Sequence, residues 1–219
     1  LPLVPVLHNT EIHYSRKRWV RFARLLSMSI TAIAVSELVR DFHARHVAPA
    51  LAARIEVIGN AIPAQPAPTA DERCAARNTL AQLFGADLEE MVVFACLARF
   101  DSQKNVAGLV ASFLNTVTDP RALLVVAGEP SDWAEMRRAD AIRRCSPRAD
   151  RVKLLASSDA RALLAAADAF ILDSFFEGWP VAATEAEASG LPLILGDFGG
   201  GRELVARDPE HSLLIENAC

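Results

Sequence analysis

Two glutamates flank the predicted start of a helix. Their spacing suits recognition of a phosphate and of the hydroxyl-rich groups on either side of it. Glu177 and Glu185 lie eight positions apart, and Pro180 between them favours a first helical turn. The free backbone N–H groups of that turn and the positive end of the helix dipole attract anions. The two carboxylates could accept hydrogen bonds from hydroxyl groups beside such an anion, as in a nucleotide sugar. Taken alone, two solvated acids at a helix start are the commoner explanation.

Two cations follow an earlier predicted strand. Arg99 and Lys104 come directly after the apolar run Met91–Cys96. In a parallel α/β sheet, the carboxyl ends of the strands face the ligand crevice, so these cations could neutralise a diphosphate and stabilise it as a leaving group. A solvated turn is the alternative. The glycine-rich segment 196–203 again lies between a short strand and a helix start, where glycines let the backbone approach a ligand.

These segments, in this order, resemble the family 4 retaining glycosyltransferases of the GT-B fold, also described as glycosyl transferases group 1. The matching segments are 57–62, 99–105, 177–185 (an E-x7-E motif), 189–192 and 197–203. The resemblance implies an α/β fold of two Rossmann-like domains, of which the C-terminal one binds a nucleoside-diphosphate (NDP) sugar. Retention of the anomeric configuration, with no metal and no cofactor besides the donor substrate, also comes from the resemblance.

Residue roles follow from the same resemblance. Arg99 and Lys104 would contact the diphosphate, Glu177 the sugar hydroxyls, and Glu185 the ribose. His8, at the end of the first predicted strand, would face the donor, so the catalytic candidates are Glu177, Arg99, Lys104 and His8. A lone histidine at a strand end is more often structural. Further donor-binding candidates border the phosphate or sugar: Gly178, Trp179, Pro180 and Val181.

Three positions depart from the family pattern and bear on loop geometry and donor preference. Ala98 replaces the glycine usual beside the arginine, and Asp173 replaces the proline that usually precedes serine. Segment 128–130 is a shortened glycine turn. None of the three changes removes a charged contact.

The chain is expected to contain two unequal parts. Residues 1–62 would be the C-terminal part of the acceptor-side domain, 63–90 a linker and helix, and 91–219 the nearly complete donor domain. Because the chain starts at Leu1 and stops at Cys219, where the resemblance implies further helices, we expect a fragment lacking both ends. Strands are predicted at 2–7, 30–35, 54–58, 91–96, 122–127, 152–155, 169–172, 193–195 and 212–215, and the later helices at 71–84, 105–117, 132–144, 159–167 and 181–189.

Composition excludes several classes of protein. With 52% hydrophobic and 23% charged residues the chain can build a core, and no apolar run approaches a membrane span. The cysteines at 74, 96, 145 and 219 lack metal-ligand spacing, so reduced thiols in the cytoplasm are expected and a zinc site is not. A net charge of −4 argues against general nucleic-acid binding.

A basic helix near the N-terminus raises the possibility of a membrane surface as partner. Its cations alternate with an apolar stripe at helical spacing: Arg16, Lys17, Arg18, Arg21 and Arg24 with Trp19, Phe22, Ala23, Leu26 and Ile30. The simpler interpretation is that the stripe packs into the core and the basic side is solvated. Binding to anionic lipid at the inner face of the cell membrane is the alternative.

The predicted function is transfer of a hexosyl group from an NDP-sugar to the hydroxyl of a glycan, a lipid-linked glycan or a lipid, as in polysaccharide or lipopolysaccharide biosynthesis. Two other possibilities stay open. One is a GT-B enzyme of another reaction type, such as a nucleotide-sugar epimerase or a phosphorylase. The other is a nucleotide-sugar-binding module that is inactive as supplied.

Overall fold

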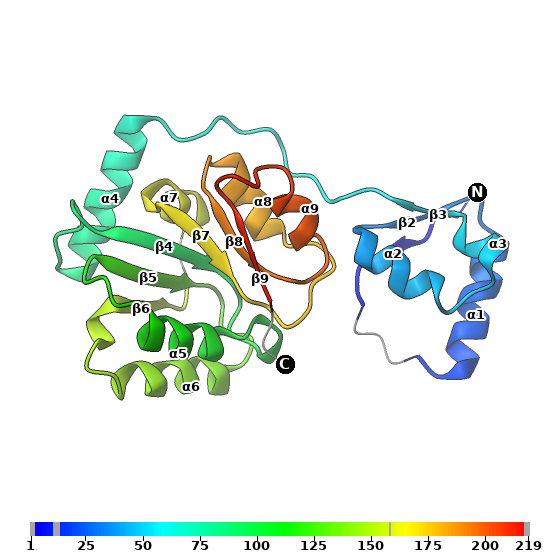
Figure 1. The fold of residues 1–219 in the computed structure, drawn as a ribbon, viewed down its shortest axis with the longest axis horizontal. Coiled ribbons are helices and arrows are strands. Elements are labelled where there is room, and N and C mark those ends of the chain that lie inside the picture. The colour runs from blue at the N-terminus through cyan, green and yellow to red at the C-terminus, as the bar shows by residue number, and fades with distance from the viewer. Residues whose placement is uncertain (1–2, 11–13, 158, 217–219) are drawn as a thin grey trace.

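The computed structural model describes residues 3–10, 14–157 and 159–216. Pro2 of the first predicted strand and Cys219 lie outside these residues. Within them the chain forms two parallel sheets, and the proline-rich segment 63–69 that runs between them has neither helix nor strand (Figure 1). The nine strands predicted from the sequence are all present. Three have the predicted limits, the first begins only at Val6, and the others differ from the predicted limits by one or two residues at one or both ends.

The first unit is a sheet of three parallel strands in the order β1-β2-β3, with three helices. Its elements are β1 (Val6–Leu7), α1 (Arg16–Ser27), β2 (Ala32–Ala34), α2 (Glu37–Ala44), α3 (Pro49–Ala52) and β3 (Ile55–Val57). Phe22 and Leu26 of α1 are buried in the core, and Trp19 stacks on His46 with ring centroids 3.9 Å apart. The expectation that the apolar stripe of the basic helix packs inward is therefore confirmed for these residues.

The second unit is a sheet of six parallel strands in the order β6-β5-β4-β7-β8-β9. The strands are β4 (Val92–Leu97), β5 (Ala122–Ala127), β6 (Val152–Leu155), β7 (Ala169–Leu172), β8 (Leu193–Gly196) and β9 (Leu213–Ile215). Every residue of β5 is buried, as expected for a central strand of a sheet covered on both faces. The two sheets make the architecture α/β and parallel throughout.

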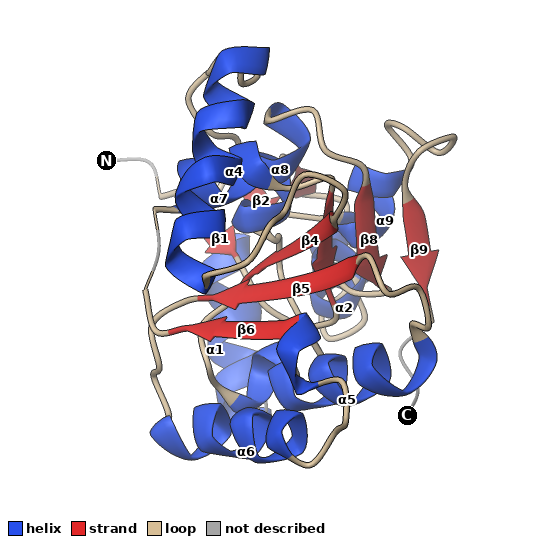
Figure 2. Cartoon of the chain, turned by 90° about the vertical axis from the view of Figure 1, so that its left-hand side faces the viewer, coloured by secondary structure: helices blue, strands red, loops and turns tan. Residues whose placement is uncertain are grey.

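Helices cover both faces of the large sheet, with α5 and α6 on one side and α4 and α7 on the other (Figure 2). The helices are α4 (Ala70–Phe84), α5 (Val106–Thr116), α6 (Trp133–Arg144), α7 (Ala160–Ala166), α8 (Val181–Ala188) and α9 (Gly201–Val205), with short 3-10 turns η1 (Ser102–Lys104) and η2 (Ala149–Arg151). Side-chain caps start several of them; Thr69 and Glu72 form a capping box at α4. The predicted helices are thus confirmed to within a residue or two.

The order of the strands creates a switch point in the large sheet. The chain builds β4, β5 and β6 outward in one direction, then crosses back to place β7, β8 and β9 on the other side of β4. Open α/β sheets bind ligands at the carboxyl ends of their strands beside such a switch point, so a ligand site is expected near the loops that leave β4 and β7.

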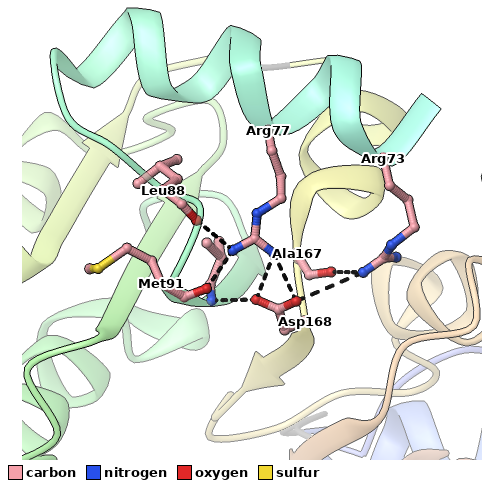
Figure 3. Close-up of polar contacts among 7 residues, drawn as sticks. Arg73, Arg77, Leu88, Met91, Ala167 and Asp168 are labelled. Atoms are coloured by element: carbon pink, nitrogen blue, oxygen red, sulfur yellow. Dashed lines mark hydrogen bonds and ion pairs between the residues drawn. The ribbon is translucent and has the colours of Figure 1, made fainter. Parts of the chain in front are cut away.

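Helix α4 is tied to the core of the large unit by two arginines that meet Asp168, at the start of β7 (Figure 3). Arg77 Nη1 donates to both Asp168 oxygens at 2.9 and 3.1 Å, and its Nη2 donates to the carbonyls of Leu88 and Met91. Asp168 also accepts from the backbone N–H of Val93 at 2.8 Å. The helix that follows the proline-rich segment is therefore fixed to the large sheet.

Candidate functional site

Most of the predicted site residues come from the two loops that leave the strands on either side of the switch point. Segment 98–105 leaves β4, and segment 173–180 leaves the neighbouring strand β7. The backbone joins the two loops directly, because the Phe175 N–H donates to the Gln103 carbonyl at 2.9 Å. The Gln103 side chain returns the contact by donating to the Phe176 carbonyl at 2.9 Å. The loops that carry Lys104 and Glu177 are thus held together as one rigid edge.

Glu177 is a buried carboxylate, only 7% exposed, and three side chains compensate its charge. Lys104 Nζ forms an ion pair with Glu177 Oε1. The hydroxyl of Ser174 donates to the same oxygen at 2.8 Å, and Gln103 Nε2 lies 3.5 Å from the other. A buried acid is tolerable only with such partners. Gln103 and Ser174 were not singled out by sequence reasoning; both lie in the motif loops, but only folding shows that they face Glu177.

Arg99 lies at the mouth of the crevice rather than inside it. Its side chain is 55% exposed and pairs with Asp101 at 3.1 Å. Asp101 in turn accepts from the Lys104 backbone N–H at 3.1 Å and so caps the 3-10 turn η1. The carboxylate that orients Arg99 therefore also fixes the turn that carries Lys104.

A crevice of about 320 Å³ lies above the ends of β4 and β5. Arg99, Lys104 and Glu185 line it together with Ala98, Gly128 and Ala160. Within the described residues, no group donates a hydrogen bond to the half-buried carboxylate of Glu185. The side chains of Arg99, Lys104 and Glu185 thus surround one crevice, and Glu177 is ion-paired to Lys104.

The segment that starts α8 is packed against the first unit. A Cβ on Gly178 would lie 1.7 Å from the His8 carbonyl oxygen, so only glycine fits there. The Trp179 side chain is 7% exposed, and its indole N–H donates to the Thr184 hydroxyl at 2.9 Å. Trp179 also packs against Gly59. Its side chain is therefore buried at the junction of the two units, and only its backbone can contact a ligand.

His8 and Val181 are both exposed, and Pro180 precedes α8 as its N-cap residue. His8 reaches the predicted site through its backbone, at Gly178. The structure therefore brings together Arg99, Lys104, Glu177 and Glu185, whereas His8, Gly178 and Trp179 meet at the adjoining junction.

The glycine-rich segment supports the site from behind. A Cβ on Gly199 would lie 2.5 Å from the Glu177 carbonyl oxygen, so this backbone runs directly under the Glu177 loop. Arg202 pairs with Asp197, and this hydrogen-bonded pairing lowers the pKa of the Asp197 carboxyl. Glu203 accepts a hydrogen bond at 2.8 Å from the backbone N–H of Glu37 in the first unit.

Among the described residues no cluster of His, Cys, Asp or Glu could hold a metal ion.

The geometry defines a parallel α/β protein with a crevice, lined by two cations and a carboxylate, above the ends of β4 and β5. Residues 91–218 match the family described as "Glycosyl transferases group 1", and the chain belongs to that family. The fold is that of the GT-B glycosyltransferases.

Three similar proteins illustrate the relationship. Alpha-maltose-1-phosphate synthase of Mycolicibacterium smegmatis is 28% identical over 212 residues, covering 92% of this chain and 52% of that protein. The Anabaena protein HepE, solved with UDP-glucose, superposes with a TM-score of 0.80 at 20% identity, over 99% of this chain and 59% of HepE. Sucrose-phosphate synthase of Thermosynechococcus elongatus gives 0.73 at 24% identity, over 94% of this chain and 50% of that chain. This chain therefore spans about half the length of these relatives.

Proposed function

We propose that the crevice binds an NDP-sugar and that the protein to which this chain corresponds transfers the sugar to an acceptor hydroxyl. One observation carries the proposal: Arg99, Lys104 and the uncompensated Glu185 line a single crevice at the switch point, and Glu177 is ion-paired to Lys104. Cations suit a diphosphate, and carboxylates suit the hydroxyls of ribose and sugar. HepE was solved with UDP-glucose in a fold of the same kind.

Each residue has a distinct role in this proposal. Arg99 and Lys104 hold the diphosphate and stabilise the charge that develops as it leaves. Glu177 orients the sugar hydroxyls, and Glu185 accepts from the ribose. The backbone of segment 178–181, at the start of α8, borders the phosphate or sugar. His8 faces the donor from the first unit. The family implies that the donor carries a hexosyl group, that transfer retains the anomeric configuration, and that no metal takes part.

Nucleotide binding is the first test. UDP, ADP and GDP would be titrated into the chain calorimetrically, each with and without its common sugar. Arg99→Ala should weaken the best ligand by about ten- to a hundredfold, the range for a charged hydrogen bond. Arg121→Ala is the matched control, because Arg121 is an exposed arginine that pairs with its neighbour Asp119. Equal affinity in wild type and Arg99→Ala would reject the donor site.

Turnover separates the proposed reaction from its competitors. Release of nucleotide that depends on an added acceptor supports transfer, conversion of the donor without acceptor indicates an epimerase, and dependence on inorganic phosphate indicates a phosphorylase. Glu177→Gln should abolish transfer without weakening nucleotide binding, since its contact is with the sugar. Donor binding without any turnover favours a nucleotide-sugar-binding module.

An anionic membrane surface is the proposed location of the acceptor, which would be a glycan, a lipid-linked glycan or a lipid. The cations of α1 are exposed, and so are Val20, Met28 and Ile30 beside them. Cations flanked by exposed apolar side chains suit the interface of an anionic bilayer. No helix among the described residues has the length and apolar character needed to cross a bilayer.

Vesicle flotation tests the surface. The chain should float with phosphatidylserine-containing vesicles and stay behind with phosphatidylcholine alone. The double variant Lys17→Glu and Arg21→Glu should not float, whereas Arg137→Glu with Arg138→Glu, the same charge change on α6, should float normally. Equal retention of both double variants would exclude α1 as the contact.

A further inference from the structure

Asn105 has an unusual backbone conformation at the heart of the site. Its φ angle is 49°, the only positive φ at a non-glycine position among the described residues. It lies between the turn η1 and helix α5, directly after Lys104. A left-handed conformation costs an L-residue roughly 1–2 kcal/mol, and Asn tolerates it better than most. Glycine would adopt it more cheaply, so the Asn side chain must contribute something that glycine lacks.

The Asn105 side-chain amide is held from two sides. Its Nδ2 donates to Asp173 Oδ2 at 3.0 Å. On the other side, a Cβ on Gly108 would lie 2.3 Å from Asn105 Oδ1 and 2.8 Å from its Cγ, so α5 has room for the amide only because residue 108 is glycine. We call Asn105, Gly108 and Asp173 the Asn105 latch. Burial raises the pKa of the Asp173 carboxyl, in keeping with a hydrogen bond in a partly desolvated setting.

The latch joins the two loops next to residues that contact Glu177. Asn105 follows Lys104 on the β4 loop, and Asp173 precedes Ser174 on the β7 loop. Lys104 and Ser174 both contact the same oxygen of Glu177. A lysine side chain is long and flexible, so the location of its ammonium depends on where its backbone is fixed. The latch fixes that backbone relative to Glu177.

We propose that the Asn105 latch positions Lys104 for the diphosphate of the donor, with Asp173 as a positioning residue. The inference rests on the proposed function for its ligand, but the positioning itself is a property of contacts among this chain's own residues. A small displacement of a charged group steeply lowers its contribution to binding. The need to hold Lys104 in place is therefore a reason for the strained backbone of Asn105 beside it.

Lysine acetylation tests the latch without any nucleotide. The chain has three lysines, Lys17, Lys104 and Lys153, so two serve as internal references within one mass-spectrometric experiment. Lys104 is 16% exposed and ion-paired, so it should react slowly in the wild type. Asp173→Ala and Asn105→Gly should each raise the Lys104 rate by about tenfold, within the range for coupled neighbours, and leave the two references unchanged. Asp173→Asn keeps an acceptor oxygen and should react like the wild type.

Asn105→Gly guards against misfolding as the explanation, because glycine adopts a positive φ without strain. Its melting temperature should stay near that of the wild type while the Lys104 rate rises. An unchanged Lys104 rate in both Asn105→Gly and Asp173→Ala would overturn the proposal. So would a rise at all three lysines, which would indicate general loosening of the fold.

A double-mutant cycle with UDP then links the latch to the ligand. Asn105→Gly should weaken UDP binding about tenfold in the wild type and have no further effect in the Lys104→Met background, because the latch acts through Lys104. Equal weakening in both backgrounds would overturn the positioning role. If UDP does not bind at all, the proposed function fails with respect to that nucleotide, while the acetylation result still decides whether the latch positions Lys104.

Discussion

Replacing Asp168 with alanine should destabilise the large unit measurably. The variant removes a two-oxygen contact with Arg77 and the acceptor of the Val93 N–H, and it leaves the Arg77 guanidinium facing two carbonyls and no anion. Breaking a fully buried pair costs roughly 3–5 kcal/mol. Because the two side chains are 22% and 33% exposed, solvent screens part of that loss, and we expect about 2–3 kcal/mol. The melting temperature should then fall by roughly 5–10 °C.

Urea denaturation followed by circular dichroism measures this change. Asp119→Ala is the matched control: Asp119 also pairs with an arginine at 2.8 Å, but both side chains are well exposed, so its urea midpoint should stay near that of the wild type. The double variant Asp168→Ala with Arg77→Met should be less destabilised than the two single changes combined. A midpoint for Asp168→Ala equal to that of Asp119→Ala would refute the view that this contact anchors α4.

Two further changes test the first unit and its junction with the second. Burial lowers the pKa of the His43 imidazole from its ordinary value of 6.5. The unfolded chain therefore takes up this proton first as the pH falls, so His43 should favour folding fully above about pH 6.5 and progressively less below it. The difference between the urea midpoints of the wild type and His43→Gln should change across that pH range. Parallel pH profiles of the two midpoints would contradict the assignment. Gly178→Ala places a methyl group 1.7 Å from the His8 carbonyl oxygen and should push the two units apart; small-angle scattering should show a larger radius of gyration, and an unchanged radius would count against this contact.

Most strands of the large sheet could be predicted from the sequence because they are continuous apolar runs bounded by polar or turn residues; β6, which contains Lys153, is the exception. Strands β5, β6 and β7 have the predicted limits to the residue. A strand buried on both faces needs no alternation of polar and apolar residues, so its length is fixed by where the polar residues begin. The short helix α3 was not predicted, since a single turn of four residues carries too little periodicity.

The motif residues could be predicted, but their partners could not. Glu177 and Lys104 are 73 positions apart, and Asn105 and Asp173 are 68 apart, so only the crossing of β7 back to β4 brings these side chains together. Trp179 shows the same limit. Its indole ring is buried against Gly59, so the predicted contact of this segment with phosphate or sugar would involve its backbone. Sequence spacing gives the loop on which a residue lies, and packing decides which way its side chain points.

The ion pair between Lys104 and Glu177 has a consequence for ligand choice under the proposed function. In the structure each charge satisfies the other. A diphosphate that draws Lys104 away would leave Glu177 buried with only Ser174 and Gln103 as partners, which opposes binding of a bare nucleotide. A nucleotide sugar supplies hydroxyl donors to Glu177 at the moment when its lysine turns to the phosphate. The pair therefore favours the complete donor over the nucleoside diphosphate that remains after transfer, and so favours release of that product.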